Sequence, residues 1–105
     1  MADIQCDETF RVFISYSHQN LPIVTDLVKI LHNNGLCPMW DRRFAFGHGF
    51  HDQIKTFISH SHVFLPIITP DSIKHGWVHQ EIGYAMALNI PVLPVAMGEL
   101  PNEMI

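Results

Sequence analysis

The chain has 105 residues, of which 48% are hydrophobic and 15% are charged, with a mean hydropathy of +0.14. This length suits one domain, and this composition excludes an intrinsically disordered chain, which has low hydrophobicity and high charge. The net charge of −4, with only six basic residues, argues against a nucleic-acid-binding surface. The acidic N-terminus does not resemble a secretory signal, and no apolar stretch approaches the roughly 20 residues of a membrane-spanning helix. We therefore expect a single cytoplasmic domain with no membrane segment.

Four short apolar runs, rich in β-branched and aromatic residues, predict buried strands. They are Arg11–Tyr16, Leu36–Trp40, Val63–Ile68 and Ile90–Val95. Pro66 counts against the third strand and Pro94 interrupts the fourth, because proline cannot donate a ladder hydrogen bond.

Segments of helical period lie between these runs. The first follows Asn20, a candidate N-cap, carries Pro22 in its first turn, and ends at Asn33-Asn34-Gly35, where glycine suits a left-handed cap. The second places Phe50, Ile54, Phe57 and Ile58 on one face and ends at His60-Ser61, and the third covers Trp77–Asn89. The last residues, Gly98–Ile105, carry no pattern.

Alternating strands and helices with short connections predict a parallel sheet with helices on both faces. In such sheets ligands bind outside the carboxyl ends of the strands, near the point where the strand order reverses. The predicted carboxyl ends are Ser15–His18, Trp40–Arg43, Thr69–Ser72 and Ala96–Gly98. We expect the functional site among these segments.

The third predicted helix contains the most informative pattern. Trp77, Glu81 and Ala85 are spaced by four residues, so they share one helical face. That face combines an indole, a carboxylate and a small side chain that leaves room for a bulky group. A glutamate near a helix N-terminus also suits the helix dipole, and this ordinary structural explanation stays open at this point. Dinucleotide-binding, phosphate-loop, nucleophile-elbow and zinc-protease motifs are absent from the sequence.

Three motifs together resemble a Toll/interleukin receptor (TIR) domain, and in particular the bacterial TIR domains that cleave NAD+. They are Phe13-Ile-Ser-Tyr-Ser17 in the first strand, Trp40-Asp41 after the second, and Ser72, Trp77, Glu81 and Ala85 in the third helical segment. The resemblance runs from about Phe10 to Met97. It implies a three-layer α/β/α, flavodoxin-like fold: a lead-in over residues 1–9 and a TIR domain over 10–105. The family has five strands, so the fifth strand and the final helix are not expected in these residues.

The resemblance also implies an activity, NAD+ glycohydrolysis, in a TIR effector of bacterial antiviral defence or immune signalling. Glu81 matches the catalytic glutamate of the family, and its carboxylate would stabilise the oxocarbenium-like ribose. Trp77 would form an aromatic wall, and the arginines would suit the pyrophosphate. By position, the candidate substrate-binding residues are Ser15, Tyr16, Ser17, Trp40, Asp41, Arg42, Arg43, Phe44 and Trp77. NAD+ would be the substrate, with no cofactor and no metal.

A second class of function, a non-catalytic module that assembles with other TIR domains, remains open. Its candidate interface is the loop Asp41–Phe50, which carries Phe44, Phe46 and Phe50. Glu81 discriminates between the two classes, because scaffold members of the family often lack this glutamate. A receiver domain of similar topology is excluded, since no acidic pair closes the first strand and no aspartate ends the third.

The candidate metal ligands form no recognisable site. Of eight histidines, only His75 and His79 have the spacing that places two imidazoles on one helical face. The two cysteines, Cys6 and Cys37, match neither a disulfide scaffold nor a metal motif. We expect surface histidines and reduced cysteines.

Overall fold

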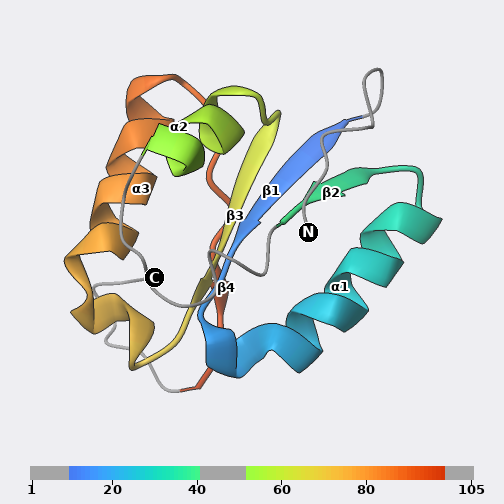
Figure 1. Ribbon diagram of the computed structural model, residues 1–105, viewed down its shortest axis with the longest axis horizontal. Helices are drawn as coiled ribbons and strands as arrows, with labels where there is room; N and C mark the ends of the chain where they lie inside the picture. Colours follow the sequence, from blue (N-terminus) through green and yellow to red (C-terminus); the bar gives the residue numbers. More distant parts are fainter. Residues whose placement is uncertain (1–9, 41–51, 99–105) are drawn as a thin grey trace.

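Four parallel strands form the sheet in the computed structural model, which describes residues 10–40 and 52–98. The strands are β1 (Arg11–Ser15), β2 (Cys37–Met39), β3 (Val63–Ile68) and β4 (Val95–Ala96), in the order β2-β1-β3-β4. This order agrees with the first four strands of the flavodoxin-like order 2-1-3-4-5. The strand order reverses between β1 and β3, so their carboxyl ends mark the expected ligand-binding edge (Figure 1).

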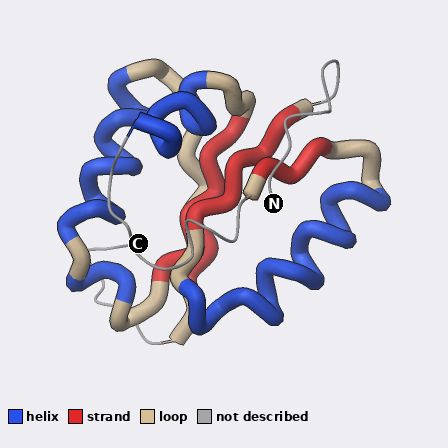
Figure 2. The backbone as a smooth tube through the Cα atoms, viewed as in Figure 1, coloured by secondary structure: helices blue, strands red, loops and turns tan. Residues whose placement is uncertain are grey.

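Helices cover both faces of the sheet and confirm the predicted three-layer α/β/α architecture. Helix α1 (Leu21–Asn33) lies on one face, and α2 (Asp52–Ser59) and α3 (Gly76–Ala87) lie on the other (Figure 2). Two 3-10 turns, η1 (His18–Asn20) and η3 (Ser72–Lys74), follow β1 and β3. Each turn leads directly toward the next helix at the carboxyl edge of the sheet.

Side chains of β1 alternate between two cores, as the two-residue period of a strand requires. Val12, Ile14 and Tyr16 belong to the core beneath α1, and Phe13 belongs to the core beneath α2 and α3. The Phe13 ring stacks on Phe57 of α2 at 5.4 Å between centroids. The same alternation turns Ser15 toward α3. A buried polar side chain on this face is therefore presented to a helix and not to solvent.

A residue in the left-handed backbone conformation follows the C-terminus of α1 and of α3, and the chain turns there toward the next strand. Gly35 has φ +80°, and the N–H of Leu36 donates to Leu31 O at 3.0 Å, which confirms the left-handed cap predicted there. Asn89 has φ 59° after α3, and Ile90 N–H donates to Ala85 O at 2.9 Å. Both ends are Schellman motifs, one built on glycine and one on asparagine.

Pro66 does not disrupt β3, although the sequence argues against a strand there. All six residues of β3 are buried, and Ser15 pairs with Pro66 in the parallel ladder. Phe64 exchanges backbone hydrogen bonds with the segment before β4, since its N–H donates to Pro91 O at 2.9 Å. Because peptide groups alternate in direction, Pro66 also turns its nitrogen toward that side. The missing N–H therefore removes no hydrogen bond to β1.

The fourth strand is shorter than the predicted Ile90–Val95 and lies later in the chain. Ladder pairing is confined to Val95 and Ala96 with β3, preceded by an isolated bridge between Phe64 and Val92. Pro94 lies between the bridge and the strand and supplies no N–H. The interruption predicted at Pro94 is therefore confirmed, whereas the predicted bounds Ile90–Val95 are wrong, because ladder pairing resumes only at Val95 and Ala96.

Cys37 is disulfide-bonded and fully buried in β2, so the prediction that this cysteine is reduced is wrong. Cys6 lies outside the described residues. The spacing of two cysteines in a sequence does not reveal whether their sulfurs meet, because a disulfide depends on the distance and direction of the Cβ atoms. Across residues 10–40 and 52–98, we find no helix with the length and hydropathy to span a bilayer.

Candidate functional site

A buried hydrogen bond joins β1 to α3 at the carboxyl edge of the sheet. The Ser15 Oγ donates to Glu81 Oε1 at 2.6 Å, and the two residues are 66 positions apart in sequence. Ser15 is 8% exposed and Glu81 is 2% exposed. A carboxylate is rarely buried without a partner, because removing it from water is costly. Glu81 is therefore the most unusual side chain of this edge.

Burial changes the protonation of Glu81. It raises the pKa of the Glu81 carboxyl from 4.5 to about 8, and the hydrogen bond from Ser15 opposes this shift by lowering the pKa. Burial disfavours the charged form, whereas a donor to the carboxylate favours it. At neutral pH the buried carboxyl is mostly protonated, but it lies close to its ionisation point. Such perturbed groups occur preferentially at functional sites.

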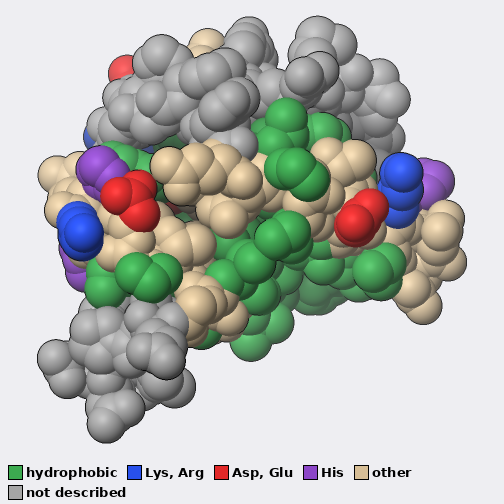
Figure 3. Space-filling view, turned by 90° about the horizontal axis from the view of Figure 1, so that it is seen from below, with side chains coloured by type: hydrophobic (Ala, Val, Ile, Leu, Met, Phe, Trp, Pro, Cys, Tyr) green, Lys and Arg blue, Asp and Glu red, His purple; other side chains and the backbone are tan. Residues whose placement is uncertain are grey.

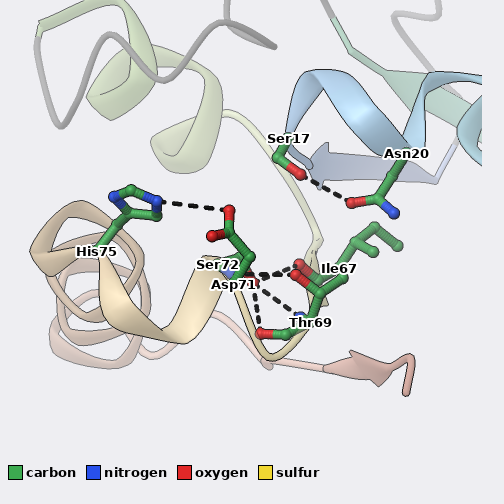
Figure 4. Close-up of polar contacts among 7 residues, drawn as sticks. All are labelled: Ser17, Asn20, Ile67, Thr69, Asp71, Ser72 and His75. Carbon is green, nitrogen blue, oxygen red and sulfur yellow. Dashed lines mark hydrogen bonds and ion pairs between the residues drawn. The ribbon is translucent and has the colours of Figure 1, made fainter.

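Ser72 holds the loop that leads from β3 into α3 (Figure 4). The N–H of Thr69 donates to Ser72 Oγ at 2.8 Å, and the N–H of Ser72 donates to Thr69 Oγ1 at 3.0 Å. Ser72 is 1% exposed, so these reciprocal bonds satisfy groups that water does not reach. The pattern of Ser72, Trp77 and Glu81 thus includes a serine with a local structural role. Thr69 was not singled out in the sequence, although a Thr-x-x-Ser spacing at a strand end is a recognisable loop signal.

The two histidines near the start of α3 have backbone and side-chain contacts of their own. His75 Nε2 lies 3.6 Å from Asp71 Oδ2, and the two side chains face each other in Figure 4. His79 Nε2 lies 3.0 Å from Ile73 O. The ring of Trp77 is half-buried and stacks with His75 at 6.3 Å between centroids. In the part of the chain that the structure describes, no group of three or more potential ligands could hold a metal ion.

Three other candidate residues lie at the carboxyl ends of β1 and β2. Tyr16 is 3% exposed and belongs to the core beneath α1, where its ring contacts Trp40 at 6.2 Å between centroids. Ser17 Oγ donates to Asn20 Oδ1 at 2.8 Å (Figure 4). Asn20 is at the N-cap position of α1 as predicted, but its side chain makes no capping hydrogen bond. Tyr16 and Ser15 therefore face opposite sides of the sheet.

Several predicted residues lie outside the described part of the chain. These are Asp41, Arg42, Arg43 and Phe44, together with Phe46 and Phe50 of the proposed interface. Their roles stay predictions from the sequence. Figure 3 looks onto the carboxyl edge of the sheet, where apolar side chains gather across the middle and charged side chains lie toward both sides.

An apolar hollow of about 530 Å³ lies beside the C-terminal half of α3. Its lining residues are Ile82, Met86, Asn89, Ile90, Pro91, Val92 and Pro94. Neither Ser15 nor Glu81 lines this hollow. These described lining residues include no ionisable side chain that could bind a phosphate, so they differ in chemistry from the Ser15–Glu81 edge.

The chain belongs to the TIR family: the TIR domain model matches residues 12–104. The match spans all four strands and both faces of the sheet, so the motifs around Ser15 and Glu81 lie within it. A search of curated proteins found no match to this sequence. TIR domains are signalling modules that associate with other TIR domains, and this defines the general class of the protein.

Solved structures share the fold at low sequence identity. The TIR domain of the Toll-related receptor TRR-2 from Hydra magnipapillata is 20% identical, with a TM-score of 0.66 over 89% of this chain and 76% of that one. The TIR domains of the activated Roq1 resistosome, which directly recognises the pathogen effector XopQ, are 17% identical, with a TM-score of 0.63 over 84% of this chain and 57% of that one. A 2-deoxyribosyltransferase from Bacillus psychrosaccharolyticus is 18% identical, with a TM-score of 0.63 over 90% of this chain and 78% of that one.

Proposed function

We propose that this TIR domain cleaves NAD+ at the bond between nicotinamide and ribose, with Glu81 as its catalytic residue. The observation that carries the proposal is a single carboxyl group buried at the strand-order reversal, with a pKa raised by burial to about 8. Its products would be nicotinamide and ADP-ribose or a cyclic form of it. The biological setting we infer is a cytoplasmic TIR effector in bacterial antiviral defence or immune signalling.

One carboxylate suffices for this chemistry. The bond between C1′ and the pyridinium nitrogen breaks, and its electron pair leaves with nicotinamide, which becomes neutral and needs no general acid. Positive charge develops on the ribose, and a nearby carboxylate stabilises it electrostatically. Water then adds to C1′ and loses a proton to Glu81 or to solvent. In the cyclic product a nucleophile within the same molecule takes the place of water.

The ionised form of Glu81 is the one that this mechanism needs. NAD+ carries a positive charge on its nicotinamide ring, and an opposite charge nearby favours the ionised carboxylate. Substrate binding would therefore lower the pKa of Glu81 from its raised value. Because Glu81 is only 2% exposed, neighbouring side chains must move before ribose reaches it.

The remaining substrate contacts are proposed from position. Trp77 lies one helical turn before Glu81 and is half-buried, which suits an aromatic wall. Ser17 follows β1 and Trp40 follows β2 at the same edge, whereas Tyr16 is buried in the core beneath α1. The candidates Asp41, Arg42, Arg43 and Phe44 rest on sequence position alone. The domain shares its fold with a 2-deoxyribosyltransferase, an enzyme that acts on glycosidic bonds. This likeness agrees with the proposal by analogy alone, because fold similarity does not establish function.

A non-catalytic assembly module is the second candidate. Large apolar side chains are exposed on α1, where Ile23 is 45% and Ile30 is 58% exposed, and such groups suit an interface. Incubating the purified, concentrated domain with NAD+ and separating the products by chromatography distinguishes the two functions. Release of nicotinamide with ADP-ribose or its cyclic form is expected, and NAD+ that remains intact at high protein concentration would favour the assembly module.

A further inference from the structure

We propose that Ser15 is a positioning residue for Glu81, whose carboxylate it orients from the central part of the sheet. The inference deepens the proposed function and rests on the catalytic role given there to Glu81. It differs from the sequence prediction that Ser15 contacts the substrate. A serine hydroxyl has one proton to donate, and here that proton is directed at Glu81 Oε1 at 2.6 Å.

The other buried serines show what a purely local role looks like. Ser61 Oγ donates to Ile58 O at 2.7 Å, three residues earlier, and closes the turn after α2. Ser72 makes its bonds within the loop around Thr69. Ser15 instead bonds a side chain 66 positions away. Ser15 is the last residue of an apolar strand, and its hydroxyl bonds the Glu81 side chain and no backbone group of a turn.

The strand gives Ser15 the rigidity that a positioning residue needs. Strand β1 pairs with β2 on one side and with β3 on the other, and its neighbours Phe13 and Ile14 are each 1% exposed. Side chains on such a packed strand hold a fixed orientation better than side chains on loops. Ser15 therefore fixes the Oε1 atom of Glu81, and the hydroxyl of Ser15 makes no hydrogen bond to Oε2.

No charged group takes over the role of Ser15 among the described residues. Helix α3 packs against α2, β3 and η3, and β3 carries no ionisable side chain. The ionisable side chains of the other elements are Asp52, Lys55, Lys74, His79 and Tyr84. Within residues 10–40 and 52–98, burial raises the pKa of Glu81 and the hydrogen bond from Ser15 lowers it. Loss of the Ser15 hydroxyl should thus raise the pKa of Glu81 further.

The direct test follows the Glu81 side-chain carboxyl carbon by ¹³C NMR during a pH titration of the whole chain. The Glu81→Gln spectrum identifies its signal among the four glutamates of the sequence. In Ser15→Ala the titration should move to higher pH by about one unit, the size expected for one hydrogen bond to a charged group. Ser15→Thr keeps the hydroxyl and should titrate like the wild type.

Ser61→Ala is the matched control, since Ser61 and Ser15 are each 8% exposed. It should lower stability but leave the Glu81 titration unchanged. If Ser15→Ala titrates like the wild type, or if Ser61→Ala shifts the titration equally, the positioning role is wrong.

Nicotinamide release by the same samples separates this inference from the proposed function. Ser15→Ala should reduce kcat/KM about tenfold at pH 7 and recover at higher pH, where more of the carboxylate is ionised. A shifted titration in a chain that releases no nicotinamide would retain the Ser15–Glu81 coupling and overturn the proposed reaction. Nicotinamide release with an unchanged pH profile in Ser15→Ala would overturn the positioning role alone.

Discussion

Ser15 Oγ and Glu81 Oε1 lie 2.6 Å apart, and this contact joins the last residue of β1 to the buried face of α3. Two opposing effects determine the pKa of Glu81. Burial disfavours the ionised carboxyl, and the hydroxyl favours it. The balance leaves Glu81 near its ionisation point at a physiological pH.

The stability of the domain should fall as pH rises between about 5 and 8. The pKa of Glu81 is about 8 in the folded chain and 4.5 as its ordinary value, so the folded chain binds more protons within this interval. Stability then decreases with pH, by on the order of 4 kcal/mol, because one pKa unit corresponds to about 1.4 kcal/mol. Urea unfolding from pH 5 to 9 measures this decrease.

Glu81→Gln should remove most of that pH dependence, because an amide of the same shape does not ionise. Asp26→Asn is the control, since it removes an exposed carboxylate from α1 and should leave the slope unchanged. Equal pH dependence in the wild type and Glu81→Gln would contradict the assignment of the slope to Glu81.

Ser72→Ala should destabilise the domain by about 2 kcal/mol. The substitution leaves the N–H of Thr69 without its 2.8 Å acceptor in a loop where Ser72 is 1% exposed. Ser59→Ala is the matched control, because Ser59 is exposed and its Oγ contacts only nearby residues, Thr56 O at 2.9 Å and His60 Nδ1 at 3.4 Å. Its effect should stay within about 0.5 kcal/mol. Equal urea midpoints for the two variants would show that the Thr69–Ser72 bonds add little.

The sequence predicted the architecture because strand and helix periods are local properties. Apolar runs placed β1 and β3, and the glycine after Asn34 marked the end of α1. The contribution of Pro66 was misjudged, since the cost of a missing N–H depends on which neighbour that residue faces. That direction is a property of the assembled sheet. The same holds for Cys37, whose disulfide depends on geometry that spacing does not contain.

The candidate site was predictable only in part. Glu81 stands out through its place in the helical pattern, and the structure places it at the sheet edge where a ligand site is expected. The sequence offered no signal that Ser15 bonds Glu81, because the contact joins residues 66 positions apart. It also placed Ser15 and Tyr16 together as substrate contacts, although adjacent residues of a strand face opposite sides.

Activity should depend on self-association through the loop Asp41–Phe50. Phe46 lies outside the described residues, so this prediction rests on the sequence. Hundredfold dilution should lower the specific activity, and Phe46→Asp should lower it at every concentration. Leu93→Asp is a control for a new charge at an apolar position, since Leu93 is 56% exposed and lies outside both α1 and this loop. A specific activity independent of concentration would count against assembly.

Removing divalent metals should change neither the melting temperature nor the turnover. His79 Nε2 is 3.0 Å from Ile73 O, and His75 faces Asp71, so both imidazoles already have neighbours within the domain. Dialysis against a chelator followed by thermal melting provides the measurement. Stoichiometric zinc in untagged protein, lost together with activity, would overturn this prediction and direct attention to His75 and His79.

The most direct test of the account compares nicotinamide release by the wild type, Glu81→Gln and Asp26→Asn under identical conditions. Glu81→Gln preserves the shape of the side chain and an acceptor for the Ser15 hydroxyl, so circular dichroism should report an unchanged fold. The account predicts release by the wild type and by Asp26→Asn, and a loss of about a hundredfold to a thousandfold in Glu81→Gln, the range typical of removing a group that stabilises transition-state charge. Undiminished release by a well-folded Glu81→Gln protein would contradict the catalytic role of Glu81.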